Sequence, residues 1–210
     1  MAYPIPHLTG NALHVAEFEV HKSRFITWIA HAPDIETAHH LVARARSTYL
    51  DARHHCSAFI AGPPGEQNAI GFSDDGEPGG TAGRPMFQVL DGSGIGQIAC
   101  VVIRYFGGIK LGTGGLARAY SKAVLLGLEQ LPTLAFVPRR LIQLKVDFAG
   151  ERDSRSWLEA QGAIIENVNY DADGVMLSVA WPTDLAHDFS ELEVRLKGKL
   201  TLVGNDSSQA

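Results

Sequence analysis

Near the start of the chain apolar and polar residues alternate, with Phe18 and Val20 set between charged and imidazole side chains. An apolar run at residues 25–30 follows, so the chain is predicted to open with a β-hairpin. Over residues 34–50 the apolar positions recur with a period of about 3.6, which is the spacing of one helix face. We therefore expect an amphipathic helix that lies on the hairpin and has Asp34 as its N-cap.

Further apolar runs predict the rest of a first domain, residues 1–134. Its expected elements are a strand at 56–61, a short helix at 84–90, a central strand at 98–106 and a helix at 113–131. Thr113 is the expected N-cap of that last helix. Residues 132–138 contain two prolines and show no periodicity, which predicts a short, stiff linker.

The remaining pattern predicts a second, smaller domain at residues 139–203, followed by a polar tail at 204–210 that is expected to be disordered. Its expected elements are strands at 141–148, 163–170, 175–181 and 199–203, with helices at 151–161 and 185–197. Gly162 is the expected left-handed stop of the first of these helices. The resulting βαββαβ order is the ferredoxin-like pattern, so the whole chain is predicted to be an α+β protein of two domains.

Composition narrows the class of protein without naming a function. The chain has 210 residues, 45% of them hydrophobic, with a net charge of −5, which is ordinary for a globular protein. Cys56 and Cys100 lie in apolar stretches without metal-site or disulfide spacing, so both are expected to be reduced core residues. No signal peptide or membrane span is indicated, and a cytoplasmic protein without a membrane partner is expected.

Charge is distributed unevenly over two glycine-rich segments. Residues 73–91 contain four acidic residues and one arginine, whereas residues 92–128 contain four basic residues and no acid. Glycine at such density is usually retained where the backbone turns with positive φ or approaches a ligand closely. The two segments are therefore the expected working surface, with opposite polarity.

The basic segment is the stronger candidate for ligand binding. Residues 112–117 fit the letters of a dinucleotide-binding glycine motif, but they do not follow a strand in a tight turn, so no nucleotide cofactor is expected. A glycine loop before a helix N-terminus still attracts phosphate or carboxylate groups. The alternative is that the glycines only turn the chain and the basic residues are solvated. The candidate nucleic-acid-binding residues are Lys110, Thr113, Gly114, Arg118, Lys122 and Arg104.

Arg104 is the exception in that group, because it lies inside an apolar strand and could instead pair with an acid of the other segment. The acidic segment has two interpretations. Its carboxylates could bind Mg²⁺ in a hydrolase, or they could accept backbone N–H groups around Gly76 and Gly79; we favour the second and expect no metal site. His55 is expected to be structural rather than catalytic. The residues of a possible cleft are His55, Ser73, Asp74, Asp75, Glu77 and Thr81.

Several ordered motifs over residues 17–125 closely resemble the IMPACT/YigZ family. They are Lys22-Ser23-Arg24-Phe25, the run at 51–56, Ser73-Asp74-Asp75-Gly76-Glu77-Pro78, the run at 80–83, and the long run at 104–116 with Arg118-Ala119-Tyr120. The acidic remainder resembles the C-terminal domain of bacterial members. The resemblance implies an N-terminal domain of ribosomal-protein type, like domain IV of elongation factor G, followed by a ferredoxin-like domain.

The resemblance also implies a link to translational control, although the eukaryotic relatives use an extra N-terminal domain that does not match any part of this sequence. No enzymatic activity is implied. We therefore expect a non-enzymatic protein that contacts the ribosome or structured RNA through the basic glycine loop. Two alternatives stay open: a metal-dependent enzyme acting on a phosphorylated small substrate, and a module that binds a translation-linked protein partner.

Overall fold

The computed structural model describes residues 1–203, so the polar tail predicted at 204–210 lies outside the described residues. Residues 3–136 form one compact unit, and residues 137–203 form the other together with Met1 and Ala2. Both units mix strands and helices, which confirms the predicted α+β class. Among the described helices, none is long and apolar enough to cross a membrane.

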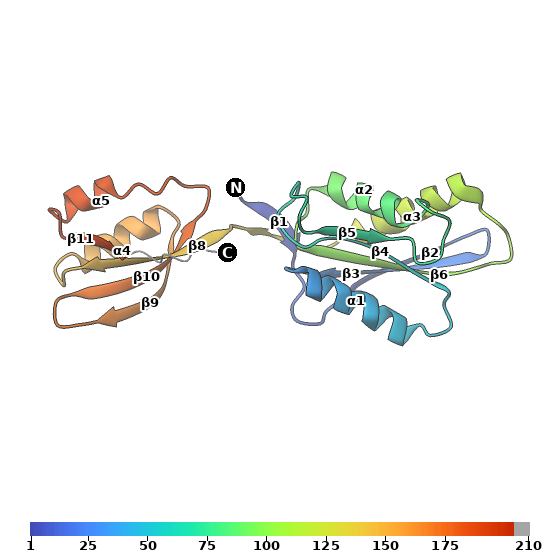
Figure 1. The fold of residues 1–210 in the computed structure, drawn as a ribbon, viewed down its shortest axis with the longest axis horizontal. Helices are drawn as coiled ribbons and strands as arrows, with labels where there is room; N and C mark the ends of the chain where they lie inside the picture. The colour runs from blue at the N-terminus through green and yellow to red at the C-terminus, as the bar shows by residue number, and fades with distance from the viewer. Residues whose placement is uncertain (204–210) are drawn as a thin grey trace. The chain divides into compact units, whose positions relative to one another are not determined.

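The first unit is a five-stranded antiparallel sheet with helices on both faces and a separate two-stranded ribbon. Its elements are β1 (Tyr3–Pro6), β2 (His14–Val20), β3 (Ser23–His31), α1 (Ile35–Thr48), β4 (His54–Ile60), β5 (Ile70–Ser73), α2 (Gly83–Ser93), β6 (Ile98–Tyr105), α3 (Gly112–Leu128) and β7 (Thr133–Phe136). The sheet order is β2-β3-β6-β4-β5. Figure 1 shows α1 on one face and α2 with α3 on the other.

Each face of this sheet has its own core, as the alternation of side chains along buried strands requires. The side chains of Phe25, Cys100 and Tyr120 belong to the core under α2 and α3, whereas Trp28 and Val101 belong to the core under α1. The continuous apolar run of β6 is buried on both faces, which is why it has no polar alternation in the sequence. The predicted hairpin is β2 and β3, and Asp34 caps α1 by accepting from the N–H of Thr37 at 2.7 Å.

The segment predicted to be a linker is partly a strand. Thr133–Phe136 forms β7, which pairs with β1, the first strand of this unit in the sequence. The rings of Tyr3 and Phe136 also pack together, with centroids 5.4 Å apart. The linker prediction was wrong for these four residues, because three of them are exposed and a strand without a buried face carries no hydrophobic alternation. The expected domain end at 134 would cut through β7.

The second unit has the predicted βαββαβ order. Its elements are β8 (Arg139–Val146), α4 (Glu151–Ala160), β9 (Ile164–Tyr170), β10 (Val175–Pro182), α5 (Ser190–Arg195) and β11 (Leu200–Val203). The strand order is β11-β8-β10-β9, so β10 lies between the two strands that α4 connects. Gly162 ends the α4 turn with φ of 70°, as predicted.

Helix α5 is shorter than the sequence indicates. The expected helix at 185–197 begins only at Ser190, because Phe189 is 3% exposed and packs against Trp157 and Trp181. Residues 183–188 are exposed, and only Phe189 turns into the core, where it joins Trp157 of α4 and Trp181 of β10 in one aromatic cluster. The apolar residues at 185–189 mimic a helical period without forming a helix.

Candidate functional site

The acidic loop, residues 73–83, connects β5 to α2 and its first carboxylate caps that helix. Asp74 accepts hydrogen bonds from the backbone N–H groups of Gly80 at 2.7 Å, Ala82 at 2.9 Å and Gly83 at 2.8 Å. Burial acts to raise the pKa of Asp74, but these three donors outweigh it and hold the pKa below its usual value. The carboxylate thus accepts hydrogen bonds from backbone N–H groups, which is the interpretation that we favoured from the sequence. The donors lie a few residues after Gly76 and Gly79, around which we expected them.

The second carboxylate joins the loop to β4 and α1. One oxygen of Asp75 accepts from the backbone N–H of His55 at 2.6 Å, and the other accepts from Arg46 Nη2 at 2.5 Å. The Asp75 carbonyl lies 2.9 Å from Nδ1 of His54. Burial lowers the pKa of His55, and the nearby Asp75 charge only partly opposes that shift. His55 is thus a buried group, 6% exposed, beside the acidic loop, and its structural role stays a prediction.

Ser73 and Thr81 close turns within the same loop. Ser73 Oγ accepts from the N–H of Asp75 at 3.3 Å, and Thr81 Oγ1 donates to the carbonyl of Pro78 at 2.6 Å. These hydroxyls therefore stabilise the loop conformation locally. Within residues 1–203, the structure contains no group of three His, Cys, Asp or Glu side chains placed to hold a metal ion.

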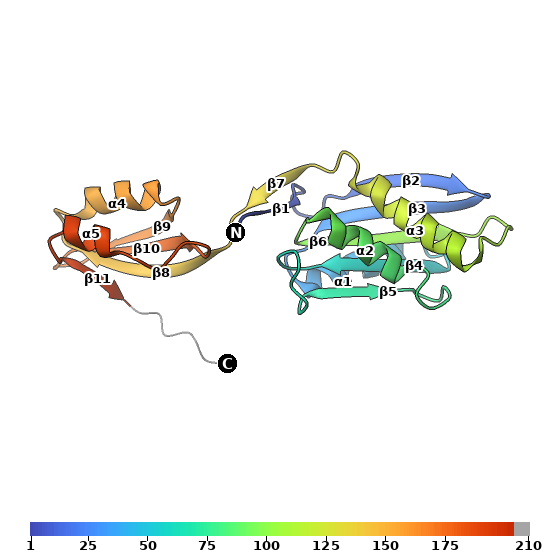
Figure 2. The ribbon, with the colours of Figure 1, turned by 90° about the horizontal axis from the view of Figure 1, so that it is seen from above.

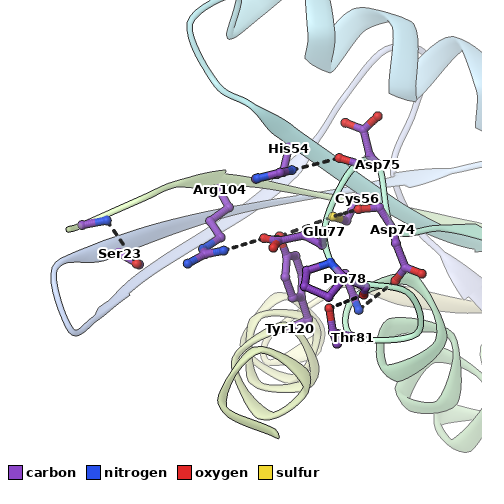
Figure 3. A network of polar contacts seen from close by, with 12 residues as sticks. Ser23, His54, Cys56, Asp74, Asp75, Glu77, Pro78, Thr81, Arg104 and Tyr120 are labelled. Carbon is purple, nitrogen blue, oxygen red and sulfur yellow. Dashed lines mark hydrogen bonds and ion pairs between the residues drawn. The ribbon is translucent and has the colours of Figure 1, made fainter. Parts of the chain in front are cut away.

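The third acid anchors the loop inside the molecule (Figure 3). Glu77 Oε1 accepts from Arg104 Nη1 at 2.7 Å and from the Tyr120 hydroxyl at 2.8 Å. The side chains of Glu77 and Arg104 are only 4% and 6% exposed. The guanidinium also lies near the rings of Phe25 and Phe106, at 5.6 and 5.8 Å. Arg104 is therefore a buried partner of the acidic loop, and its assignment as a phosphate contact was wrong because pairing satisfies its charge internally.

Cys56 extends this network without becoming reactive. Its Sγ lies 3.0 Å from the Asp74 carbonyl and 3.3 Å from the Tyr120 hydroxyl, so its single proton has two alternative acceptors. Burial raises the pKa of the Cys56 thiol to about 12, against the smaller opposing effect of the Tyr120 hydrogen bond. Burial also raises the pKa of Cys100. Both cysteines are buried and free, and at neutral pH they are protonated thiols.

The basic residues come together in a different place, which we call the basic groove. It is a cavity of about 350 Å³ between the end of β2, the glycine loop after β6 and the first turns of α3. Its lining residues are Phe18, Glu19, Val20, His21, Ile109, Lys110, Leu111, Gly115, Arg118, Ala119 and Lys122. Three of the predicted phosphate contacts, Lys110, Arg118 and Lys122, thus share one groove.

Close backbone packing fixes the glycine loop beside the hairpin. A Cβ on Gly107 would lie 1.9 Å from the carbonyl carbon of Lys22, so only glycine allows this approach. The N–H of Gly107 also donates to Ser23 Oγ at 3.2 Å. The β2–β3 turn and the loop are consequently held against each other, which brings His21 and Lys110 to the same groove.

The start of α3 differs from the prediction. The helix begins at Gly112 after Leu111, and no side chain caps it. Thr113 lies within the first turn, so its assignment as N-cap was wrong. Thr113 and Gly114 are exposed but do not line the basic groove. The side chain of Arg118 folds back over this turn, so that its Nη1 would lie 3.5 Å from a Cβ placed on Gly114.

The groove cations have no acidic partner among residues 1–203, in contrast to Arg104. Neither hydrogen bonds nor salt bridges link Lys110, Arg118 or Lys122 to a carboxylate in this part of the chain. Lys122 Nζ lies 5.1 Å from the centroid of the Phe18 ring, and Glu19 is the one acid in the lining. The sequence analysis did not predict that residues of β2 line the groove, because sheet packing brings β2 beside α3. The nearest indication in the sequence was the Lys22-Ser23-Arg24-Phe25 motif, which follows β2.

Residues 21–128, more than half of the chain, match a family model described as the Impact N-terminal domain. The chain belongs to the IMPACT family. The predicted resemblance is confirmed, and the matched residues include the acidic loop, the buried network and all of the basic groove except its lining residues on β2.

Relatives cover nearly all of this IMPACT family chain. It is 46% identical to the IMPACT family member YigZ of Escherichia coli (strain K12) over 173 residues, which is 82% of this chain and 84% of that protein. It is 39% identical to an IMPACT family member of Haemophilus influenzae over 197 residues, 93% and 95% of the two chains. A solved structure described as a crystal structure of an hypothetical protein is 40% identical, with a TM-score of 0.69 and 98% coverage of each chain.

Proposed function

We propose that this protein acts in translation regulation in the cytoplasm by binding the phosphate backbone of structured RNA, on or off the ribosome, and catalyses no reaction itself. The observation that carries the proposal is the basic groove, where Lys110, Arg118 and Lys122 converge without acidic partners in the described chain. The link to translation comes from the resemblance to the IMPACT family described above.

Electrostatics favours phosphate over other ligands at this groove. The three cations outnumber the single acid, Glu19, and the uncapped first turn of α3 adds partial positive charge from its free N–H groups. None of the residues that line the groove belongs to the acidic loop. This separation of polarity suits a binding surface better than an acid–base active site.

Cosedimentation with purified ribosomes across a salt series tests the proposal. If the groove neutralises about three phosphates, the logarithm of the binding constant should fall with the logarithm of salt concentration with a slope of roughly −2 to −3. The double variant Lys110→Glu/Arg118→Glu should weaken binding and flatten the slope by about two contacts. Titration with an isolated structured RNA in the same salts separates RNA binding from binding to ribosomal protein.

A matched control is the double variant Arg53→Glu/Lys197→Glu. Both residues are exposed, lie outside the basic groove and form no salt bridge in residues 1–203, so the change in net charge is identical. We expect this control to bind nearly as the wild type does. Binding that is insensitive to salt, or that falls equally in both double variants, would contradict the proposal.

A further inference from the structure

A second surface of the first unit has the features of a peptide-binding edge. Within residues 1–203, strand β5 is an edge strand of the sheet and pairs only with β4. In an antiparallel ladder, bonded pairs alternate with pairs that exchange no hydrogen bonds. The N–H of Ala61 donates to Ala69 at 2.7 Å, and Gly71 opposite Phe59 is the next bonded pair in this register. Ile70 and Phe72 therefore direct their N–H and C=O groups away from β4.

A groove of about 620 Å³ runs beside this free edge, on the face of the sheet that α1 covers. It exists because α1 packs over β4 and β6 and leaves β5 uncovered. The Phe59 ring lies over Gly71, where a Cβ would be only 2.4 Å from it, so this ring position depends on the glycine. The lining residues are Ile35, His39, Val42, Ala43, Arg46, Ser57, Phe59, Ile70, Gly71, Phe72 and Ser73.

The helix contributes one stripe to this groove, from Ile35 through His39 and Val42 to Arg46. Ile35, at the start of this stripe, is 40% exposed. The stripe spans roughly 16 Å at 1.5 Å per helical residue, which equals about five residues of an extended strand. The groove is thus long enough for a short strand and is apolar over most of its length.

The charge of the groove indicates the chemistry of its occupant. Its only ionisable lining residues are His39 and Arg46, and no acid lines it. Arg46 is 55% exposed and, within residues 1–203, forms hydrogen bonds only through Nη2, to Asp75. Its other N–H donors have no hydrogen-bond partner in this part of the chain, so a second carboxylate can accept from them.

We propose that this groove binds an extended peptide segment of a partner protein, added to β5 as a further strand. Apolar side chains at alternate positions enter the groove beside Phe59 and Val42, and an acidic side chain pairs with Arg46. Main-chain hydrogen bonds to Ile70 and Phe72 supply the register. This site is distinct from the basic groove, so its existence does not depend on RNA binding.

Two blocked pentapeptides test the proposal with the isotope-labelled full chain: acetyl-Glu-Thr-Val-Thr-Val-amide for an antiparallel strand and acetyl-Val-Thr-Val-Thr-Glu-amide for a parallel one. Arg46 lies at the Ser73 end of β5, so each peptide places its acid there in one direction only. One of them should shift the amide NMR signals of Ile70 and Phe72 together with those of α1 that face the groove.

Controls on the peptide keep the test independent of protein folding. Methylation of the two peptide nitrogens that face β5 should lower affinity by at least about tenfold, because two main-chain hydrogen bonds are lost. Replacing the peptide Glu with Lys should lower affinity several-fold, as should Arg46→Gln in the protein. The matched variant Arg53→Gln, at an exposed arginine outside the groove, should change nothing.

Filling the groove gives a second test, because Ala43→Trp places a large ring in it from an exposed helix position. This variant should abolish the shifts at Ile70 and Phe72. The proposal is overturned if neither peptide binds, if methylated and unmethylated peptides bind equally, or if the shifts lie outside β5 and α1. It is equally overturned if the free protein shows concentration-dependent shifts at these amides, since a second copy would then be the occupant.

Discussion

The two loops of the first unit are both rich in glycine, but they carry opposite charge and have different roles. Strands β5 and β6 both run antiparallel to β4, so the loops that follow them leave the sheet at the same end (Figure 2). In the acidic loop every carboxylate has partners within the molecule, from Asp74 to Glu77. In the basic groove, Lys110, Arg118 and Lys122 form no ion pair with a carboxylate in residues 1–203. Glycine density with charge therefore marks a structural anchor in one loop and an open surface in the other.

The largest expected effect that separates the two loops is on stability, at Glu77. Glu77→Gln removes the charge that compensates Arg104, and loss of one partner of a buried pair typically costs about 3–5 kcal/mol. The measurement is the free energy of unfolding in urea. The double variant Glu77→Leu/Arg104→Met removes both charges and should lose much less. A loss below about 1 kcal/mol for Glu77→Gln would contradict the anchoring role.

Removing the helix cap should come next in size. Asp74→Ala leaves three backbone N–H groups without their acceptor, and we expect a loss of about 2–3 kcal/mol in unfolding free energy. Asp91→Ala, at an exposed acid of α2, is the matched control and should cost little. Since the Asp74 pKa is depressed, its contribution is present above the unfolded pKa and is lost as pH falls through the folded value.

Divalent metal ions probe the same loop from the ligand side. The carboxylates of Asp74 and Asp75 already accept protein hydrogen bonds, so we expect Mg²⁺ or Mn²⁺ to leave the melting temperature unchanged. A metal that binds only the folded state would raise that temperature by linkage. A clear rise that disappears in Asp75→Ala would favour the metal-dependent enzyme over a binding protein.

The pH dependence of stability should be a smaller effect than loss of the Asp74 cap. Burial lowers the pKa of His55 from its ordinary value of 6.5, so the unfolded chain binds this proton more readily than the folded chain. Stability attributable to His55 is therefore complete above about pH 6.5 and falls below it, by at most about 1.4 kcal/mol per pH unit. His55→Gln should flatten this part of the profile, whereas His40→Gln, at an exposed histidine, should leave it unchanged. A His55→Gln profile identical to wild type would show that the proton is taken up elsewhere.

The smallest effect on stability is expected in the basic groove. Lys110→Glu/Arg118→Glu alters exposed cations without ion-pair partners in the described chain, so the unfolding free energy should change by less than about 0.5 kcal/mol. The same variant should show the largest loss in ribosome binding. A destabilisation comparable to that of Glu77→Gln would mean that both loops are structural anchors.

Much of the architecture followed from local pattern. The hairpin, helix α1 with its Asp34 cap, the buried strand β6 and the βαββαβ order all correspond to periodicities that a single segment carries. The sequence did not predict β7, the late start of α5 or the uncapped start of α3. Each of these depends on a partner distant in sequence or on a backbone conformation that no side-chain type signals.

At the candidate site, the sequence by itself determined which residue types were available and that acid and base were segregated into two glycine-rich segments. Only the tertiary structure decided which charged side chains are paired within the protein and which are left unpaired. It places Arg104 against Glu77 in a buried pair and brings Lys110, Arg118 and Lys122 into one groove with Phe18. The physical reason is that desolvation and pairing depend on neighbours across the sheet, and strand register and helix packing choose those neighbours.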